Sequence, residues 1–143
     1  MKLEKLMPYQ HHKMATPWTS TIQSTDDNNP VNWQTVHTLV TPDLLGTPTS
    51  LYEISAGIGW NLDSNKKGAM FRMVVDGVAT DFISIEPKDK HDKLMNIFKI
   101  WKDNHTSDGP ITVEIQALIT DRGQGNPTLT VTSLDIVVER KHQ

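Results

Sequence analysis

The stretch ITVEIQALIT, residues 111–120, carries the clearest structural signal in the chain. Its odd-numbered positions are all aliphatic, and they alternate with Thr112, Glu114 and Gln116. Successive side chains of a β-strand point to opposite faces, so this alternation predicts a strand with one face in a core and the other toward solvent. A sheet with one apolar face has to be covered by a second layer. The stretch therefore predicts a β-sandwich or barrel.

Alternating runs recur before this stretch, separated by turn residues. The strongest are LYEISAGIGW at 51–60 and AMFRMVV at 69–75, and weaker ones are QTVHTLV at 34–40 and VATDFISI at 78–85. The first two can pair as a hairpin across NLDSNKKG, residues 61–68. Short alternating runs between Gly, Pro, Asn and Asp clusters are typical of antiparallel sandwiches. We therefore expect an all-β fold, an antiparallel β-sandwich or jelly roll of about eight strands.

The C-terminal run LTVTSLDIVVE, residues 129–139, breaks the alternation at one point. Its apolar residues change parity between Val131 and Leu134. A β-bulge produces such a change, because it places two residues of one strand opposite one residue of the partner. Either Thr132-Ser133 forms a bulge, or both faces of the strand are buried there.

The segment KDKHDKLMNIFKIWKDN, residues 88–104, fits two structures. Its apolar residues match a helical stripe and a strand almost equally well. Strands are expected on both sides of it, and a turn follows it. We therefore favour a strand that ends near Trp101, with room for one helical turn around residues 90–93.

The sequence divides near residue 17. Residues 1–17 show no period, whereas residues 18–143 contain all the alternating runs. We therefore expect an extended N-terminal arm, 1–17, followed by one β-sandwich domain, 18–143. We expect apolar side chains of the arm to bind another surface or another subunit, namely Leu3, Leu6, Met7 and Tyr9. A frayed terminus is the alternative.

Composition and charge exclude several classes of protein. The chain has 143 residues, which suits one domain with one core. A net charge of -3 argues against a dedicated nucleic-acid-binding protein, because such a protein needs a basic face. There is no cysteine, so the fold has to be stable without disulfides. No nucleic-acid partner is expected.

The N-terminal sequence also argues against secretion and membrane insertion. Glu4, Lys5 and Pro8 interrupt the apolar core that a signal peptide requires. No run approaches the roughly 20 apolar residues that cross a bilayer as a helix. We expect a protein that is made in the cytoplasm and has no membrane partner.

No motif for catalysis or metal binding emerges. His11 and His12 are adjacent and point to opposite faces of a strand, so they do not present two nitrogens to one metal ion. The other histidines are scattered: His37, His91, His105 and His142. The chain has no nucleophile elbow, phosphate-binding loop or HExxH motif. We expect no metal, no cofactor and no enzymatic activity.

Four tryptophans are the remaining candidates for a binding function. Trp60 and Trp101 have the apolar parity of their runs, so we expect them in the core. Trp18 and Trp33 lie in loop-like sequence, and they either anchor an interface or pack in the ordinary way. Exposed tryptophans would also offer a stacking platform for sugars.

Five short motifs follow one another between residues 52 and 140. They are Tyr52, Ile54, Ser55 and Trp60; FRMVVDG at 71–77; EPKD at 86–89; Gly109 with ITV at 111–113; and LDIVVER at 134–140. This order resembles a family of small β-sandwich proteins from the virions of tailed bacteriophages, which includes capsid decoration or cement proteins. The resemblance covers about residues 34–140 and leaves out the N-terminal arm. EPKD after the VDG turn is its most distinctive part.

The resemblance implies a structural role in a virion. It implies a jelly-roll-like sandwich that binds the outside of the head and adds contacts to the major capsid protein or another virion protein. It also implies a small symmetric homo-oligomer, for which we favour a trimer. The alternative is a carbohydrate- or receptor-binding sandwich on a phage tail or fibre.

Overall fold

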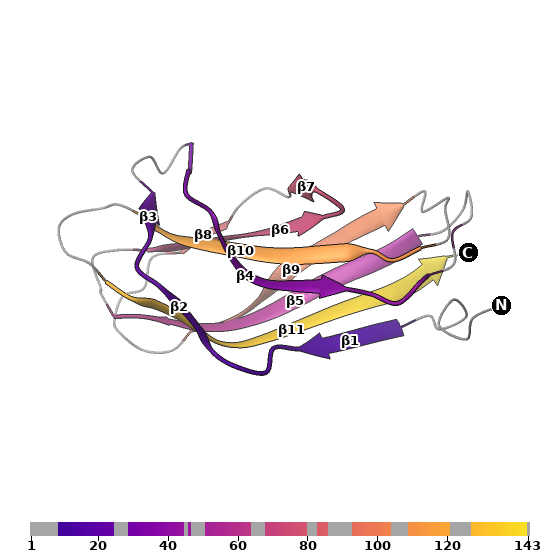
Figure 1. Cartoon of the computed structure of the whole chain (residues 1–143), viewed down its shortest axis with the longest axis horizontal. Helices are drawn as coiled ribbons and strands as arrows, with labels where there is room; N and C mark the ends of the chain where they lie inside the picture. The colour runs from indigo at the N-terminus through magenta and orange to yellow at the C-terminus, as the bar shows by residue number, and fades with distance from the viewer. Residues whose placement is uncertain are drawn as a thin grey trace.

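The fold consists of strands throughout the part of the chain that the structure describes. The computed structural model describes residues 9–24, 29–44, 46, 51–63, 68–79, 83–85, 93–103, 109–120 and 127–142. The strands are β1 (Tyr9–Lys13), β2 (Trp18–Ser20), β3 (Gln23–Ser24), β4 (Gln34–Val40), β5 (Leu51–Leu62), β6 (Ala69–Val75), β7 (Val78–Ala79), β8 (Ile83–Ile85), β9 (Lys93–Asp103), β10 (Thr112–Thr120) and β11 (Leu129–His142). The longer strands run along the long axis of the molecule (Figure 1). The expected all-β fold is confirmed.

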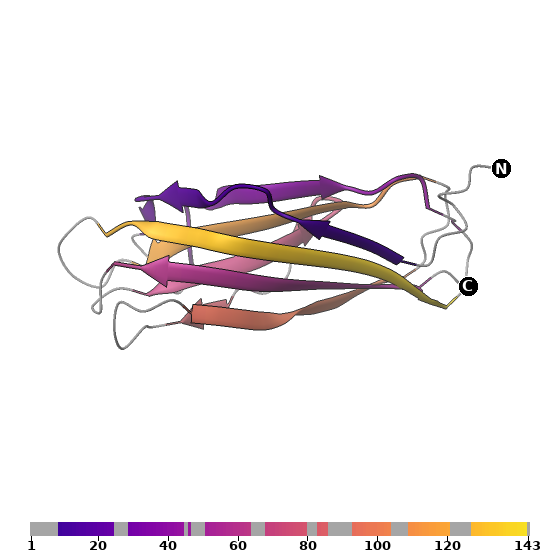
Figure 2. The same cartoon turned by 90° about the horizontal axis from the view of Figure 1, so that it is seen from below.

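The strands form two sheets (Figure 2). In the first sheet, β11 lies between β5 and the edge strands β1 and β2, and β9 lies beyond β5. In the second sheet, β10 lies between β6 and the edge strands β3 and β4, while β7 and β8 pair with the far side of β6. Three pairs of strands share an edge in this way, so the eleven strands of the described residues fill eight positions.

The chain changes sheet at most of its connections. It crosses from one sheet to the other between β2 and β3, β4 and β5, β5 and β6, β8 and β9, β9 and β10, and β10 and β11. At these connections, strands that are neighbours in sequence face each other across the core, whereas β6 and β7 pair within one sheet. This wrapping of antiparallel strands into two packed sheets is the jelly-roll arrangement.

The expected hairpin across residues 61–68 is wrong, because β5 and β6 belong to different sheets. Both strands have an apolar face, and the sandwich buries these faces against each other instead of placing the strands side by side. Trp60 of β5 and Phe71 of β6 meet across the core with ring centroids 5.6 Å apart and planes at 54°. Such tilted aromatic pairs add to the stability that burial provides.

The core lies between the sheets and follows the alternation of the sequence. In β5, Tyr52, Ile54, Ile58 and Trp60 are all buried. In β10 the buried set includes Val113, Ile115, Ala117 and Ile119, and β11 adds Val131, Leu134, Ile136 and Val138. Each fully buried aliphatic side chain contributes about 1.5–3 kcal/mol relative to an exposed one. The expectation that Trp60 lies in the core is confirmed, whereas the side chain of Trp101, in β9, lies outside the described part.

The Asp76-Gly77 turn joins β6 and β7 as expected. Asp76 has φ 48° and Gly77 has φ 85°. A two-residue hairpin turn of this kind needs positive φ at both central residues, which Asp and Gly tolerate. The Asp76 carboxylate also accepts a hydrogen bond of 2.8 Å from the backbone N–H of Thr112. The EPKD segment, residues 86–89, lies outside the described residues.

Two further expectations are decided by the strand register. The pairing of β11 with β5 skips Thr132, between Val131 and Ser133, so the bulge is confirmed. Residues 93–103 form strand β9, which settles the choice between helix and strand for most of that segment. The helical turn expected around residues 90–93 falls on residues 90–92, outside the described part, and on Lys93, which begins the strand.

Candidate interaction site at the N-terminal edge

Strand β1 forms one edge of the first sheet. It pairs with β11 from Tyr9 opposite Glu139 to Lys13 opposite Asp135. Part of the segment expected as an arm is therefore an edge strand of the sandwich. Within the described residues β1 ends its sheet. An edge strand presents backbone N–H and C=O groups that another chain can pair with, so this edge is a candidate contact surface.

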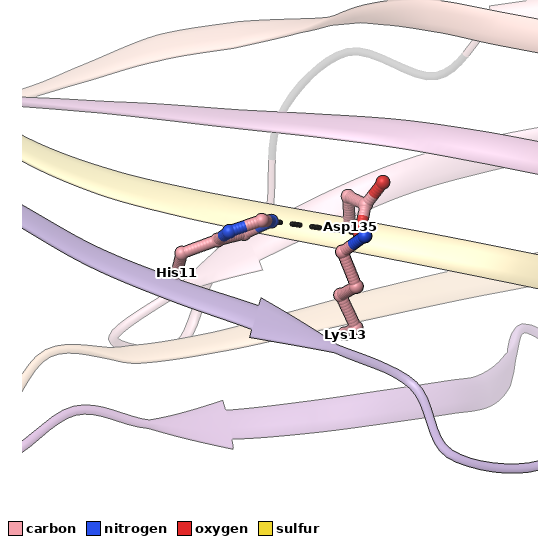
Figure 3. Close-up of polar contacts among 3 residues, drawn as sticks. All are labelled: His11, Lys13 and Asp135. Atoms are coloured by element: carbon pink, nitrogen blue, oxygen red, sulfur yellow. Dashed lines mark ion pairs between the residues drawn. The ribbon is translucent and has the colours of Figure 1, made fainter.

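The outward face of β1 is charged (Figure 3). His11 Nε2 lies 3.5 Å from Asp135 Oδ1, and Lys13 Nζ lies 4.0 Å from the same oxygen. All three side chains are more than a third exposed. Exposed ion pairs contribute little to stability, typically about 0–1 kcal/mol. Their position on an edge instead favours a role in discouraging unwanted strand pairing or in meeting a charged partner.

The inward face of β1 carries a second histidine, His12, which meets His37 of β4. His12 lies opposite Ile136 of β11, and His37 lies opposite Ile115 of β10. Both of these isoleucines are fully buried, so the two histidines point into the gap between the sheets. Because β1 and β4 are edges of different sheets, the pair closes one side of the sandwich.

The two imidazoles meet through their Nε2 atoms. These atoms are 2.7 Å apart, the ring centroids are 4.7 Å apart and the ring planes are inclined by 15°. Atoms of stacked rings stay about 3.5 Å apart, so rings in face-to-face contact would not allow this distance. The rings therefore meet edge to edge, and one Nε2–H donates to the lone pair of the other Nε2. The histidines must then be in different tautomers or share one proton.

A bulge in β4 explains why His37 points inward. The pairing of β4 with β10 skips Val36, so Thr35 lies opposite Gln116 and His37 lies opposite Ile115. A bulge places two consecutive residues on the same side of a strand. Val36 is buried and His37 is half-buried, whereas a regular strand would turn one of them outward.

The surroundings of His37 disfavour positive charge. Burial lowers the pKa of His37 below its ordinary value, and the neighbouring His12 lowers it further. Both effects penalise the imidazolium form, because an ion loses hydration between β1 and β4 and because two like charges repel. His37 is therefore mainly neutral in the folded protein near neutral pH.

The two tryptophans proposed as interface anchors lie on different sheets. Trp18 of β2 is half-buried and packs against the core, opposite Val131 of β11. Trp33 precedes β4, and the Arg72 guanidinium lies 4.5 Å from its ring centroid. A cation over an aromatic face is favourable by about 0.5–1 kcal/mol at an exposed site. The two tryptophans thus do not form one aromatic platform.

A row of polar contacts crosses the outer face of the second sheet next to Trp33. Arg72 Nε donates to Gln116 Oε1 at 2.6 Å, and Gln116 Nε2 donates to Glu114 Oε1 at 2.9 Å. The Thr35 hydroxyl also donates to Glu114 Oε1. These residues come from β6, β10 and β4, so the row spans three strands. It could meet a polar partner, although its groups already bond one another.

Of the site residues expected from the sequence, Tyr9 lies in the edge strand β1. Trp18 lies in β2, which pairs with another part of the same side of β11. Leu3, Leu6 and Met7 lie outside the described residues. The sequence reasoning missed the His12–His37 pair, because the two residues are separated by 25 positions and belong to different sheets. Residues 1–17 show no period and 34–40 has no apolar parity, so the sequence carried no signal for this pair.

The described part of the chain contains neither a cluster of metal-binding side chains nor a membrane-spanning helix. No group of three or more His, Cys, Asp or Glu side chains there is placed to hold a metal ion. No helix in those residues is long and apolar enough to cross a membrane.

Comparisons by sequence found no relative. No family model matches the chain, and no curated protein matches it. Comparison by structure found viral and bacterial chains at low sequence identity, so the likeness concerns the fold alone.

The similar structures include a chain of infectious bursal disease virus, Gt strain, with a TM-score of 0.55, 10% identity and 92% of this chain covered. They also include the VP2 subviral particle of that virus, with a TM-score of 0.47, 12% identity and 92% coverage. A third is the insecticidal delta-endotoxin Cry8Ea1 from Bacillus thuringiensis, with a TM-score of 0.45, 7% identity and 84% coverage. The chain spans 33%, 33% and 19% of these proteins, respectively. The first comparison shows that the jelly-roll-like fold is shared with part of that viral chain.

Proposed function

We propose that this chain is a structural protein of a virion, and that it decorates the head of a tailed bacteriophage. The observation that supports this most is the jelly-roll sandwich, which aligns over 92% of its length with a viral chain. The motif order from Tyr52 to Arg140, which resembles phage decoration proteins, supports the narrower assignment. Because the chain spans only 33% of that viral chain, its role is argued from its own surfaces.

The proposed mechanism is stabilisation by added contacts. A protein that binds the assembled shell but not its separate subunits shifts the equilibrium toward the shell by mass action. Each bound copy adds buried interface between neighbouring subunits of the major capsid protein or another virion protein. A symmetric oligomer, for which a trimer is our proposal, would place several such contacts around one axis.

We assign the contact to the N-terminal edge. β1 offers an edge for strand pairing, and its outward face carries His11 and Lys13 with Asp135. Residues 1–8 precede this strand, and their Leu3, Leu6 and Met7 are apolar side chains suited to a clasp on a neighbour. Ordering such a segment on a partner buries its apolar surface.

The test is co-sedimentation of the purified chain with mature and immature shells of the phage that encodes it. Saturable binding to mature shells is expected, together with a rise in the temperature at which the shells release their DNA. Deletion of residues 1–8 should weaken binding while leaving β1 in place. The matched control is Val78→Ser, which changes an exposed side chain on β7 at the opposite edge of the second sheet. Absence of binding to either shell would overturn the proposal.

A second candidate is a glycan-binding module, favoured by one observation. Trp33, Arg72 and Gln116 place an aromatic ring beside hydrogen-bonding groups on one outer face. Sugars stack on aromatic rings and bond to neighbouring polar groups. A glycan array tests this candidate. Binding that is lost in Trp33→Ala and retained in Trp18→Ala would support it, and absence of binding would rule it out.

A further inference from the structure

The seam between β1 and β4 combines three features that are not needed for packing. Two histidines face each other at positions where each strand turns toward the core. They belong to different sheets, and they meet through one hydrogen bond of 2.7 Å. A bulge at Val36 is what brings His37 into this position.

We propose that the His12–His37 pair is a pH-sensitive latch that holds the N-terminal edge strand against the second sheet, and that its double protonation releases β1 while the core stays folded. The inference concerns the sandwich itself and does not depend on the proposed virion role.

The physical basis is the number of protons that the pair accommodates. With no extra proton or with one, a single hydrogen lies between the two Nε2 atoms and the bond is intact. With two extra protons, both Nε2 atoms carry hydrogens that point at each other, and two positive charges face across a short distance. The hydrogen bond is then lost and replaced by repulsion.

Charged groups near the seam do not compensate for this second charge. On β1, His11 and Lys13 are on the outward face, with Asp135 of β11. Glu139 of β11 lies opposite Tyr9, which has the same outward parity.

The remaining strands at the seam offer no closer carboxylate among the described residues. Arg140 of β11 lies four residues beyond Ile136 along the strand, opposite Tyr52, and is itself positive. Glu114 of β10 is on the outer face, where it accepts hydrogen bonds from Thr35 and Gln116. β4 contains no titratable residue besides His37. The inward-facing neighbours, Ile115 and Ile136, are apolar.

Release should be local to β1. This strand is five residues long, and its strand neighbour within the described residues is β11. The core, by contrast, is formed by buried side chains of β5, β6, β10 and β11. Edge elements open at lower free energy than core strands.

The direction of the pH effect follows from the lowered pKa of His37. When β1 is open, His37 binds a proton at the ordinary histidine pKa of about 6.5, and when β1 is closed it binds one only at lower pH. Closing is therefore fully favoured above about pH 6.5 and becomes less favourable as the pH falls below that value. Each unit by which the pKa is lowered corresponds to about a tenfold change in the opening equilibrium.

The experiment is NMR on the full chain labelled with ¹⁵N, at about pH 7.5 and about pH 5, a range in which histidine changes charge. Long-range imidazole spectra should show one protonated and one bare Nε2 at the higher pH. Amide exchange of residues 10–13, corrected for intrinsic rates and divided by that of β10, should rise about tenfold or more at the lower pH.

Variants separate the latch from general acid sensitivity. His12→Leu/His37→Leu removes both titrating groups, and exchange of β1 relative to β10 should then be nearly independent of pH. His11→Gln changes the outward neighbour and should retain the wild-type pH dependence. The β10 amides report in each sample whether the core is folded. Equal pH dependence in wild type and the double variant, or no change in β1 of the wild type, would overturn the proposal.

Discussion

Two of the bulges, at Thr132 in the central strand β11 and at Val36 in the edge strand β4, have different consequences. In β11 the skipped residue is Thr132, and the residues on either side of the irregularity, Val131 and Leu134, both remain buried. In β4 the skipped residue is Val36, and its effect is to turn a polar residue, His37, toward the core side. The first bulge preserves a hydrophobic face, and the second one interrupts it with histidine.

The difference follows from the number of neighbours that each strand has. β11 pairs with β5 on one side and with β1 and β2 on the other, so its register is fixed along both edges. A one-residue slip there would turn every buried side chain to the outside. β4 pairs with β10, and no other partner of β4 lies in the described residues. An edge strand of this kind tolerates a polar inward residue, because only half of its surroundings are packed.

The largest expected effect comes from breaking the register of β11. Deletion of Val137, an outward-facing residue, forces either Val138 or the pair Leu134 and Ile136 to change face. For comparison, replacing one buried aliphatic residue by alanine costs about 2–5 kcal/mol. The total stability of a domain is about 5–15 kcal/mol. We expect this variant not to fold, as measured by circular dichroism and urea titration.

Deletion of Thr132 is the matched comparison within the same strand. It removes the extra residue of the bulge and leaves both flanking registers intact, so we expect a folded protein with a cooperative unfolding transition. Equal loss of structure in the two deletions would mean that the bulge is itself required, and the argument from register would fail.

The same contrast explains what the sequence allowed us to predict. The bulge of β11 was visible as a parity change, because strongly apolar residues stand on both sides of Thr132. The alternation of 111–120 and 51–60 predicted two buried faces, and the structure has them. The sequence did not show which strands pair, so the hairpin across 61–68 was wrongly expected. Alternation fixes which face of a strand is buried but not which strand lies beside it.

The histidine pair was beyond the reach of sequence reasoning. QTVHTLV has no run of apolar residues on one parity, so nothing marks Val36 as an inserted residue. The sequence gives the direction of His12 relative to near neighbours such as His11, but not relative to a residue 25 positions away. Contact between His12 and His37 depends on how two sheet edges lie across the core, which is a property of the assembled sandwich.

The next largest effect is expected on acidification, and it concerns His37, which the bulge in β4 turns inward. In wild type, the lowered pKa of His37 means that the unfolded chain binds more protons than the folded one as the pH falls below about 6.5. Stability should therefore decrease on acidification in this range. His37→Leu removes that term, so its urea midpoint should fall less than that of wild type between about pH 7 and about pH 5. His11→Gln serves as the control, and a parallel loss in all three proteins would assign the acid sensitivity to other groups.

A smaller effect on stability is expected at Gly59, which lies opposite the bulge in β11. A Cβ atom on Gly59 would overlap the Ser133 hydroxyl, which the bulge brings close to it. Gly59→Ala should cost about 1 kcal/mol, since the serine is exposed and partly able to turn away. Ser133→Ala removes the overlapping oxygen, so the same Gly59→Ala change should cost less in that background. A double-mutant cycle by urea unfolding gives the coupling, and additive effects would contradict the proposed overlap.

The smallest effect is expected on the outward face of β1. Asp135→Asn removes the carboxylate that His11 and Lys13 approach at 3.5 Å and 4.0 Å. These side chains are exposed, so the free energy of unfolding should change by no more than about 0.5 kcal/mol. Exchange of the β1 amides should also keep its wild-type pH dependence, because the His12–His37 bond lies on the other face of the same strand. If Asp135→Asn released β1 as strongly as acid does, the strand would be held by its outward charges, and the inward pair would lose its special role.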